Sequence, residues 1–301
     1  MHVVTGASGR FGRLAVERLR ERVDASSIVA VTRTPERIAD LGVVVRQADF
    51  TDPGSLTAAF DGADRVLVSA TGARSLGRRA ELHRNAFDAA VKAGAGHVLY
   101  QSMVRAGEPG HPLSLMPEHG ATERVLAESG VPFTVVRLNV EPDVLLMTLP
   151  LAEAVATGTL ATANGSGHVG YVTWEDSAEV GAALLAEGGH EGQYVDVSGP
   201  AALDHGDVAD ALAEATGRPV RYEPGESQDD WDTYLARLPE ALTSSVPEQA
   251  LRAGFEFWTC AEAGWFDVVT HTVPRLTGRP ATSLAGFLTA HRDQLLGRTE
   301  F

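Results

Sequence analysis

A chain of 301 residues with 44% apolar and 22% charged residues has the composition of a globular protein with one large domain or two small ones. Its net charge of −15 disfavours nucleic acid and anionic membranes as partners, and no apolar stretch reaches the ~18 residues of a membrane span. Cys260 is the only cysteine, which excludes an intramolecular disulfide and favours the cytoplasm. No HExxH or comparable histidine spacing occurs, so no metal site is expected.

Short β-rich runs alternate with helical patterns over the first 139 residues. Strands are expected at 2–6, 27–33, 43–50, 65–72, 97–103 and 132–139. Helices are expected at 11–23, 55–62, 78–93 and 117–130, the second of them starting at a Ser cap. Because the strands are apolar on both faces and each is followed by a crossover, the pattern predicts an α/β fold with a doubly wound parallel Rossmann sheet.

The pattern is less regular after residue 139. Helices are expected at 143–157, 174–187, 204–216 and 281–296, strands at 169–173 and 193–199, and a Gly-rich turn at 162–168. Residues 1–139, completed by about 168–199, are therefore predicted to form the Rossmann core. Residues 140–167 and 200–301 form a smaller, discontinuous substrate lobe, and the cleft between the two is the default ligand site. The aromatic stretch 258–266 can line an acceptor pocket, but lobe core is the preferred interpretation.

A glycine-rich loop joins the first strand to the first helix. Its glycines lie three residues apart, at Gly6, Gly9 and Gly12. A P-loop would end in Gly-Lys-Ser/Thr, whereas Arg and Leu follow Gly12, so the loop is typical of a dinucleotide site. The pyrophosphate would lie at the helix N-terminus, and the predicted contacts within the loop include Ser8, Arg10 and Phe11.

The end of the second strand favours NADP(H) over NAD(H). NAD sites usually place an acid there to hold the ribose, whereas this chain places Arg33. A guanidinium suits a 2′-phosphate through its charge and paired donors. The alternative is an ordinary surface arginine at a strand end.

Further cofactor contacts are expected at the carboxyl ends of the other strands, where ligands bind in such sheets. They are Asp49 and Phe50 beside the adenine, and Ser69, Ala70, Thr71 and Ser102. Tyr100 is a candidate at the fifth strand, or simply core. His119 and Glu123 share a helix face, so His119 can bind the nicotinamide ribose, donate a proton or pair with Glu123.

The proton-donating dyad of many short-chain reductases, Tyr-x-x-x-Lys, is missing. Lys92 is the only lysine, and the residues four after the five tyrosines are Val104, Glu175, Ser198, Glu226 and Leu238. The chain therefore either does not reduce simple ketones in that way or carries out no redox chemistry.

The loop "TGASGRFG", "ADFTDPGSL", "YQSMV" and the block "EHGATERVLAESGVPFTVVRLN" together resemble the NmrA-like group of atypical short-chain dehydrogenases. The block is similar to type-2 NAD(P)H:quinone oxidoreductases, with His119 where other members of the group have Lys. The resemblance implies NADPH as the hydride source, an electron-poor acceptor, and a catalytic site with His119, Tyr100 and Asn139. The segment after Asn139, "VEPD", departs from the aromatic stretch of the quinone reductases.

The preferred hypothesis is an NADPH-dependent oxidoreductase that transfers hydride to a quinone or similar conjugated carbonyl compound. A delocalised phenolate-like product needs less acid assistance than an alkoxide, so the missing dyad is tolerable. Two alternatives stay open: a non-catalytic NADP-binding sensor that binds a partner protein, and a biosynthetic reductase for an aromatic or polyketide-like substrate. The expected partner is a small-molecule acceptor, and a homodimer is possible.

Overall fold

A parallel sheet of seven strands forms the centre of the molecule. The computed structural model describes residues 1–72, 75, 77–162, 165–224, 231–237, 243–244 and 248–298. The strand order is β3-β2-β1-β4-β5-β6-β8, and every pairing is parallel. The strands are β1 (His2–Val4), β2 (Ile28–Thr32), β3 (Val44–Gln47), β4 (Arg65–Val68), β5 (His97–Met103), β6 (Phe133–Leu138) and β8 (Gln193–Val197). The chain winds outward from β1 in both directions, which confirms the doubly wound Rossmann fold.

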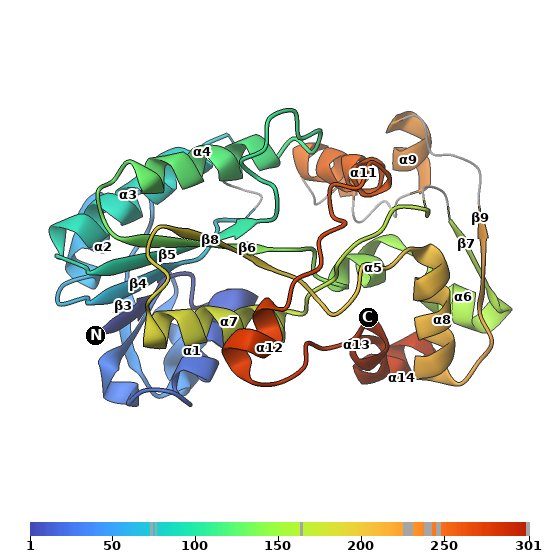
Figure 1. Cartoon of the computed structure of the whole chain (residues 1–301), viewed down its shortest axis with the longest axis horizontal. Coiled ribbons are helices and arrows are strands. Elements are labelled where there is room, and N and C mark those ends of the chain that lie inside the picture. The colour runs from blue at the N-terminus through green and yellow to red at the C-terminus, as the bar shows by residue number, and fades with distance from the viewer. Residues whose placement is uncertain are drawn as a thin grey trace.

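Helices cover both faces of this sheet (Figure 1). One face carries α1 (Arg10–Leu19), α7 (Trp174–Glu187) and α12 (Thr272–Thr277). The other carries α2 (Pro53–Ala59), α3 (Arg79–Lys92) and α4 (Met116–Ala127). The short 3₁₀ helices η1 (Ala25–Ser27) and η2 (Pro35–Leu41) flank β2. Each helical layer closes its own apolar core against the sheet, so strands such as β2 are buried along their whole length.

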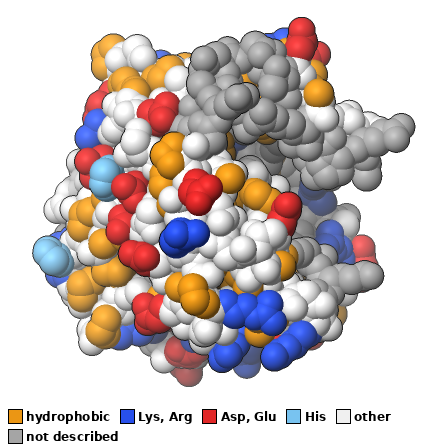
Figure 2. Space-filling view, turned by 90° about the vertical axis from the view of Figure 1, so that its right-hand side faces the viewer, with side chains coloured by type: hydrophobic (Ala, Val, Ile, Leu, Met, Phe, Trp, Pro, Cys, Tyr) orange, Lys and Arg blue, Asp and Glu red, His pale blue; other side chains and the backbone are white. Residues whose placement is uncertain are grey.

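A second lobe lies beside the carboxyl half of the sheet (Figure 1). Its elements are α5 (Asp143–Thr148), α6 (Leu151–Thr157), β7 (Thr159–Thr162), α8 (His205–Thr216), β9 (Arg221–Pro224), α9 (Trp231–Arg237), α11 (Glu248–Glu262), α13 (Leu284–Ala290) and α14 (Arg292–Leu295). β7 and β9 pair in parallel as a separate two-stranded sheet, which the sequence did not predict. Figure 2 looks at the outer face of this lobe, where acidic, basic and hydrophobic side chains are interspersed.

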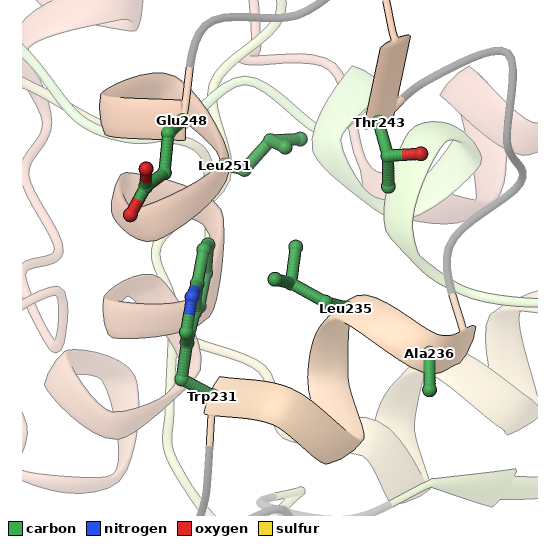
Figure 3. Close-up of a pocket in the computed structure, with 6 residues that line it drawn as sticks. All are labelled: Trp231, Leu235, Ala236, Thr243, Glu248 and Leu251. Carbon is green, nitrogen blue, oxygen red and sulfur yellow. The ribbon is translucent and has the colours of Figure 1, made fainter.

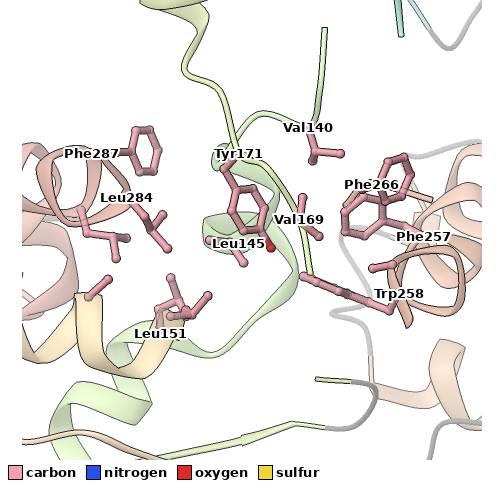
Figure 4. Packing of buried hydrophobic residues seen from close by; sticks show 14 of the residues in the cluster. Val140, Leu145, Leu151, Val169, Tyr171, Phe257, Trp258, Phe266, Leu284 and Phe287 are labelled. Carbon is pink, nitrogen blue, oxygen red and sulfur yellow. The ribbon is translucent and has the colours of Figure 1, made fainter. Parts of the chain in front are cut away.

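The second lobe has its own apolar core (Figure 4). Leu145 and Tyr171 lie in the middle of this cluster, with Phe287 on one side and Phe266 on the other. The aromatic stretch 258–266 contributes Trp258 and other buried residues to it, which confirms the core interpretation. The division of the chain at residues 139 and 140 into core and substrate lobe stays a prediction.

Several expected elements are shorter or divided. The helix expected over 143–157 breaks before Pro150, because a residue that precedes proline favours an extended backbone, as Leu149 adopts. The helix expected over 281–296 is interrupted at His291. The helix expected over 55–62 begins earlier, with Asp52 as its cap: its carboxylate accepts from the backbone N–H groups of residues 54 and 55.

The strand expected over 169–173 is not formed. Val169 makes a single antiparallel bridge with Leu203, and Val172 donates its backbone N–H to the carbonyl of Val140. Two residues of the expected Gly-rich turn, 163 and 164, lie outside the described residues. Among the described helices, none has both the length and the apolar character needed to cross a membrane.

Candidate active site

The glycine loop between β1 and α1 forms a tight cradle. Gly6 has a φ of +64°, in the left-handed region, and its carbonyl accepts the backbone N–H of Gly9 at 2.8 Å. A Cβ at residue 12 would lie 2.7 Å from the carbonyl carbon of Gly6, so only Gly12 lets the helix pack this close. The three glycines therefore have the distinct structural roles that a dinucleotide loop requires.

The N-terminus of α1 is left open for an anion. Its N-cap is Gly9, no side chain caps the helix, and its first turn contains no acidic residue. The free backbone N–H groups and the helix dipole together favour a pyrophosphate at this point. Because the N-terminus of α1 is uncapped, the loop fits the pyrophosphate of a dinucleotide.

Arg33 lies at the end of β2 with an exposed guanidinium. In the part of the chain that the structure describes, this guanidinium has no ion pair or hydrogen bond, whereas Arg13 on α1 is paired with Asp40. Next to Arg33, Thr32 donates its hydroxyl to Ser8 of the glycine loop at 2.8 Å, which joins the loop to β2. Its guanidinium is therefore available for a phosphate, and the phosphate contact of Arg33 stays a prediction.

Asp49 and Phe50 follow β3 on the same edge of the sheet. Asp49 accepts both the backbone N–H and the hydroxyl of Thr51 at 2.8 Å, and these bonds, with Arg33 nearby, lower the pKa of its carboxyl. Phe50 packs edge-on against His83, with ring centroids 5.4 Å apart. Both residues stay candidates for flanking the adenine.

Two loop side chains have structural partners instead of facing a free phosphate site. The Phe11 ring is 4% exposed and lies against Trp174 of α7, so only its backbone N–H can serve a cofactor. Arg10 is ion-paired with Asp143 of α5 and lies 3.9 Å from Glu175. The prediction of phosphate contacts from these two side chains is therefore not supported by this arrangement.

The end of β4 is held by its neighbours. The Ser69 hydroxyl donates to the carbonyl of Thr5 at 2.8 Å, so it faces β1 and not a cofactor. The backbone N–H of Ala70 donates to the Gln101 side chain at 3.1 Å. Thr71 differs, because its hydroxyl is buried without a hydrogen-bond partner among the described residues. A ligand at this edge can satisfy it.

His119 on α4 is coupled to Tyr100 on β5. The Tyr100 hydroxyl lies 3.1 Å from Nδ1 of His119, and the two side chains are 0% and 4% exposed. Burial, together with the Arg79 and His83 neighbours, lowers the pKa of His119 well below its usual value, and burial raises the pKa of Tyr100. His119 is therefore neutral near pH 7. When Tyr100 donates to Nδ1, the ring proton is on Nε2, which can donate one hydrogen bond.

This geometry corrects two predicted roles. Tyr100 is fully buried and cannot touch a substrate, so it positions His119. His119 does not pair with Glu123, whose carboxylate instead accepts from the Ser102 hydroxyl at 2.6 Å and from Arg137 at 3.0 and 2.6 Å. Ser102 therefore faces α4 rather than a cofactor.

Asn139 also has a structural role. Its side-chain nitrogen donates to the carbonyls of Phe266 and Val268, both at 3.1 Å, and its side-chain oxygen accepts from Val140 at 2.9 Å. Asn139 is 1% exposed, and its side chain joins the segment after β6 to the residues between α11 and α12. These bonds occupy the side chain of Asn139, so they favour a structural role over the predicted catalytic one.

A cavity of about 530 Å³ opens between α9 and α11 in the second lobe (Figure 3). Its lining residues are Trp231, Leu235, Ala236, Thr243, Glu248 and Leu251. None of the predicted site residues lines it, so it is separate from the glycine-loop site. Over the described residues, no group of three or more His, Cys, Asp or Glu side chains is placed to hold a metal ion.

The profile of a family described as NAD(P)H-binding matches residues 6–187, which include the whole glycine loop, Arg33 and His119. The chain belongs to this NAD(P)H-binding family. This NAD(P)H-binding protein is 33% identical to quinone oxidoreductase 2 of Escherichia coli over 290 residues, covering 95% of this chain and 96% of the relative. It is 30% identical to the NAD(P)H azoreductase of Xenophilus azovorans, with 97% and 98% covered. It is also 28% identical to an NmrA-like family domain-containing oxidoreductase of Aspergillus flavus, with 97% and 96% covered.

The solved structures that resemble this chain include reductases, as its sequence relatives do. The NADPH complex of E. coli quinone oxidoreductase 2 superposes with a TM-score of 0.84 at 31% identity, over 97% of this chain and 99% of the other. Citrobacter triphenylmethane reductase with NADP(H) gives 0.83 at 27% identity, again over 97% and 99%. The expected NAD(P)H-dependent oxidoreductase with a Rossmann fold is therefore confirmed, and the Aspergillus flavus relative supports the NmrA-like resemblance.

The sequence reasoning missed three charged residues of this NAD(P)H-binding protein. Arg137 pairs with the buried Glu123, Arg79 donates to the carbonyl of Thr71 at 2.6 Å, and Glu141 lies partly buried after β6. Arg137 lies in the block that ends at Asn139, and Glu141 lies in the segment "VEPD" that follows it. An arginine inside an otherwise apolar strand was the available signal for the Glu123 pair.

Proposed function

We propose that this protein transfers hydride from NADPH to a quinone or a similar conjugated carbonyl compound. The observation that carries the proposal is the Arg33 guanidinium, unpaired in the described part of the chain, beside a glycine loop whose helix N-terminus is open. An anion-binding loop with a free guanidinium at the adjacent strand end suits a dinucleotide with a 2′-phosphate. NADPH supplies the hydride, and the protein supplies position and electrostatics.

The residues around the sheet edge suit an acceptor that needs little acid assistance. Neutral His119 can hold the nicotinamide ribose through Nε2, while Thr71 offers a hydroxyl that has no hydrogen-bond partner among the described residues. A quinone that accepts hydride becomes a delocalised anion, so the missing Tyr-x-x-x-Lys dyad is tolerable. The relatives named for quinone and azo reduction support the same class of acceptor.

The acceptor would bind where the two lobes meet. Partly buried apolar side chains from four segments pack here against the second core: Met103, Leu115, Val144 and Val268. Val268 belongs to the stretch whose carbonyls accept hydrogen bonds from the Asn139 side chain. An apolar junction of this kind suits a flat conjugated ring.

The direct test is anaerobic NADPH oxidation by the purified protein with a panel of quinones and enones. Turnover of about 1–1000 per second with at least one of them is expected. Tight NADPH binding without turnover, with a co-purifying protein, would instead support the sensor alternative. Activity confined to one elaborate aromatic substrate would support the biosynthetic alternative.

We further infer action in the cytoplasm, which the single, fully buried Cys260 suits. A homodimer is a hypothesis that light scattering of the purified protein tests. A small-molecule acceptor remains the proposed partner.

A further inference from the structure

Glu141 lies on a rigid segment at the carboxyl edge of the sheet, between β6 and α5. The backbone on either side is fixed, because Val172 donates to the carbonyl of Val140 at 3.0 Å and Val144 donates to that of Glu141 at 3.1 Å. The side-chain bonds of Asn139 hold the same segment from the other side. The backbone of Glu141 is therefore held at the carboxyl edge of the sheet, three residues before Val144, which we propose to line the acceptor site.

The charges around this carboxyl leave it without a cation of its own. Among the described residues, two charged side chains act on the Glu141 carboxyl: the acidic Asp143, two residues later, and the basic Arg10 at the start of α1. Arg10 is already ion-paired with Asp143 and has Glu175 of α7 at 3.9 Å. In the described part of the chain, the Glu141 carboxyl makes no ion pair and no hydrogen bond to another residue.

A partly buried carboxylate beside a second carboxylate is unfavourable when its only nearby cation is shared. The pKa of Glu141 is raised to about 8, mainly by burial. The negative charge of Asp143 also raises this pKa, and the positive charge of Arg10 lowers it. The group is therefore protonated at neutral pH. A neutral carboxyl is a proton donor, which few side chains are under these conditions.

The other ionisable groups of the site do not serve as acids at neutral pH. Burial makes His119 neutral by lowering its pKa, and burial raises the pKa of Tyr100. The Ser102 hydroxyl is bonded to Glu123. Reduction of a quinone to a hydroquinone nevertheless consumes one proton in addition to the hydride.

We propose that the carboxyl of Glu141 donates this proton to the acceptor, a role that rests on the proposed function. As the hydride from NADPH reduces the quinone, the O–H bond of Glu141 breaks and an O–H bond forms on the acceptor oxygen. The carboxylate left behind regains a proton from water. The segment "VEPD", which departs from the aromatic stretch of the quinone reductases, thus brings its own acid to the site.

The test compares the wild type with Glu141→Gln, which keeps the size of the side chain but cannot donate the proton. Glu175→Gln is the matched control, since it removes a carboxylate beside the same Arg10. With menadione and NADPH, the wild-type kcat/KM should fall as the pH rises above about 8, where Glu141 ionises. Glu141→Gln should lower kcat/KM about 100-fold at pH 7 and abolish this decline, and Glu175→Gln should do neither.

A second measurement needs neither cofactor nor turnover. Carbon-13 NMR of the ligand-free protein, labelled at glutamate carboxyls, should show one resonance that titrates near pH 8 and is missing in Glu141→Gln. Unchanged activity and pH profile in Glu141→Gln, or no such resonance, would overturn the assignment of Glu141 alone. A wild type that oxidises no NADPH with any acceptor would overturn the proposed function, and the donor role with it.

Discussion

Replacing Arg33 with alanine isolates the recognition of the 2′-phosphate. The guanidinium is exposed at the end of β2, and its removal breaks no ion pair or hydrogen bond among the described residues. A hydrogen bond to a charged group contributes about 1.5–3 kcal/mol. Since 1.4 kcal/mol corresponds to a factor of ten, the Kd for NADPH should rise about 10- to 150-fold. The Kd for NADH, which has no 2′-phosphate, should hardly change.

Fluorescence titration of the two reduced cofactors measures both constants on the same protein. Arg33→Glu should weaken NADPH binding further, because it adds repulsion. Arg124→Glu is the control: it makes the same change of charge on α4, which lies over β5 and β6, away from β2. If Arg33→Ala weakened NADPH and NADH binding equally, Arg33 would act on the loop, and its recognition of the 2′-phosphate would be refuted.

Three further changes test the packing and charge of the fold. Gly12→Ala places a Cβ 2.7 Å from the carbonyl carbon of Gly6, so calorimetry should show more than about tenfold weaker NADPH binding, and wild-type affinity would contradict the close packing. Glu123→Gln removes the buried carboxylate that pairs with the partly buried Arg137, and urea unfolding should show a loss of about 3–5 kcal/mol; a change under 1 kcal/mol would contradict this estimate. Burial lowers the pKa of His205 to about 4, so the unfolded chain binds more protons below pH 6.5 and the free energy of unfolding should fall from pH 6.5 towards 4. His205→Gln should make that decline shallower, and an identical decline would show that other groups cause it.

The Rossmann half of the fold could be predicted because its signals are local. Each buried strand is a short apolar run followed by a helix with its own periodicity, and Gly6, Gly9 and Gly12 mark the first turn. Arg33 could be predicted for the same reason, because its position depends only on where β2 ends. The second lobe was less predictable, since β7 and β9 pair across some 60 residues and Pro150 divides one helix.

Side-chain partners could not be predicted, because they come from elements far apart in the chain. Arg10 meets Asp143, 133 residues later, and so is not free for a phosphate. Asn139 is bonded to carbonyls more than 120 residues away, which turns a proposed catalytic residue into a positioning one. Phe11 differs, because its buried ring belongs to the apolar face of α1, and the periodicity of such a face is a local signal in the sequence.

The central claim is direct hydride transfer from NADPH to a conjugated acceptor. Its most direct test is an anaerobic single-turnover experiment in which protein loaded with NADPH is mixed with menadione and followed at the NADPH absorbance. Hydride transfer should give decay at about 1–1000 per second, one hydroquinone for each NADPH consumed, and slower decay with deuterium at the transferred position. NADPH that stays bound and unoxidised after mixing would contradict it.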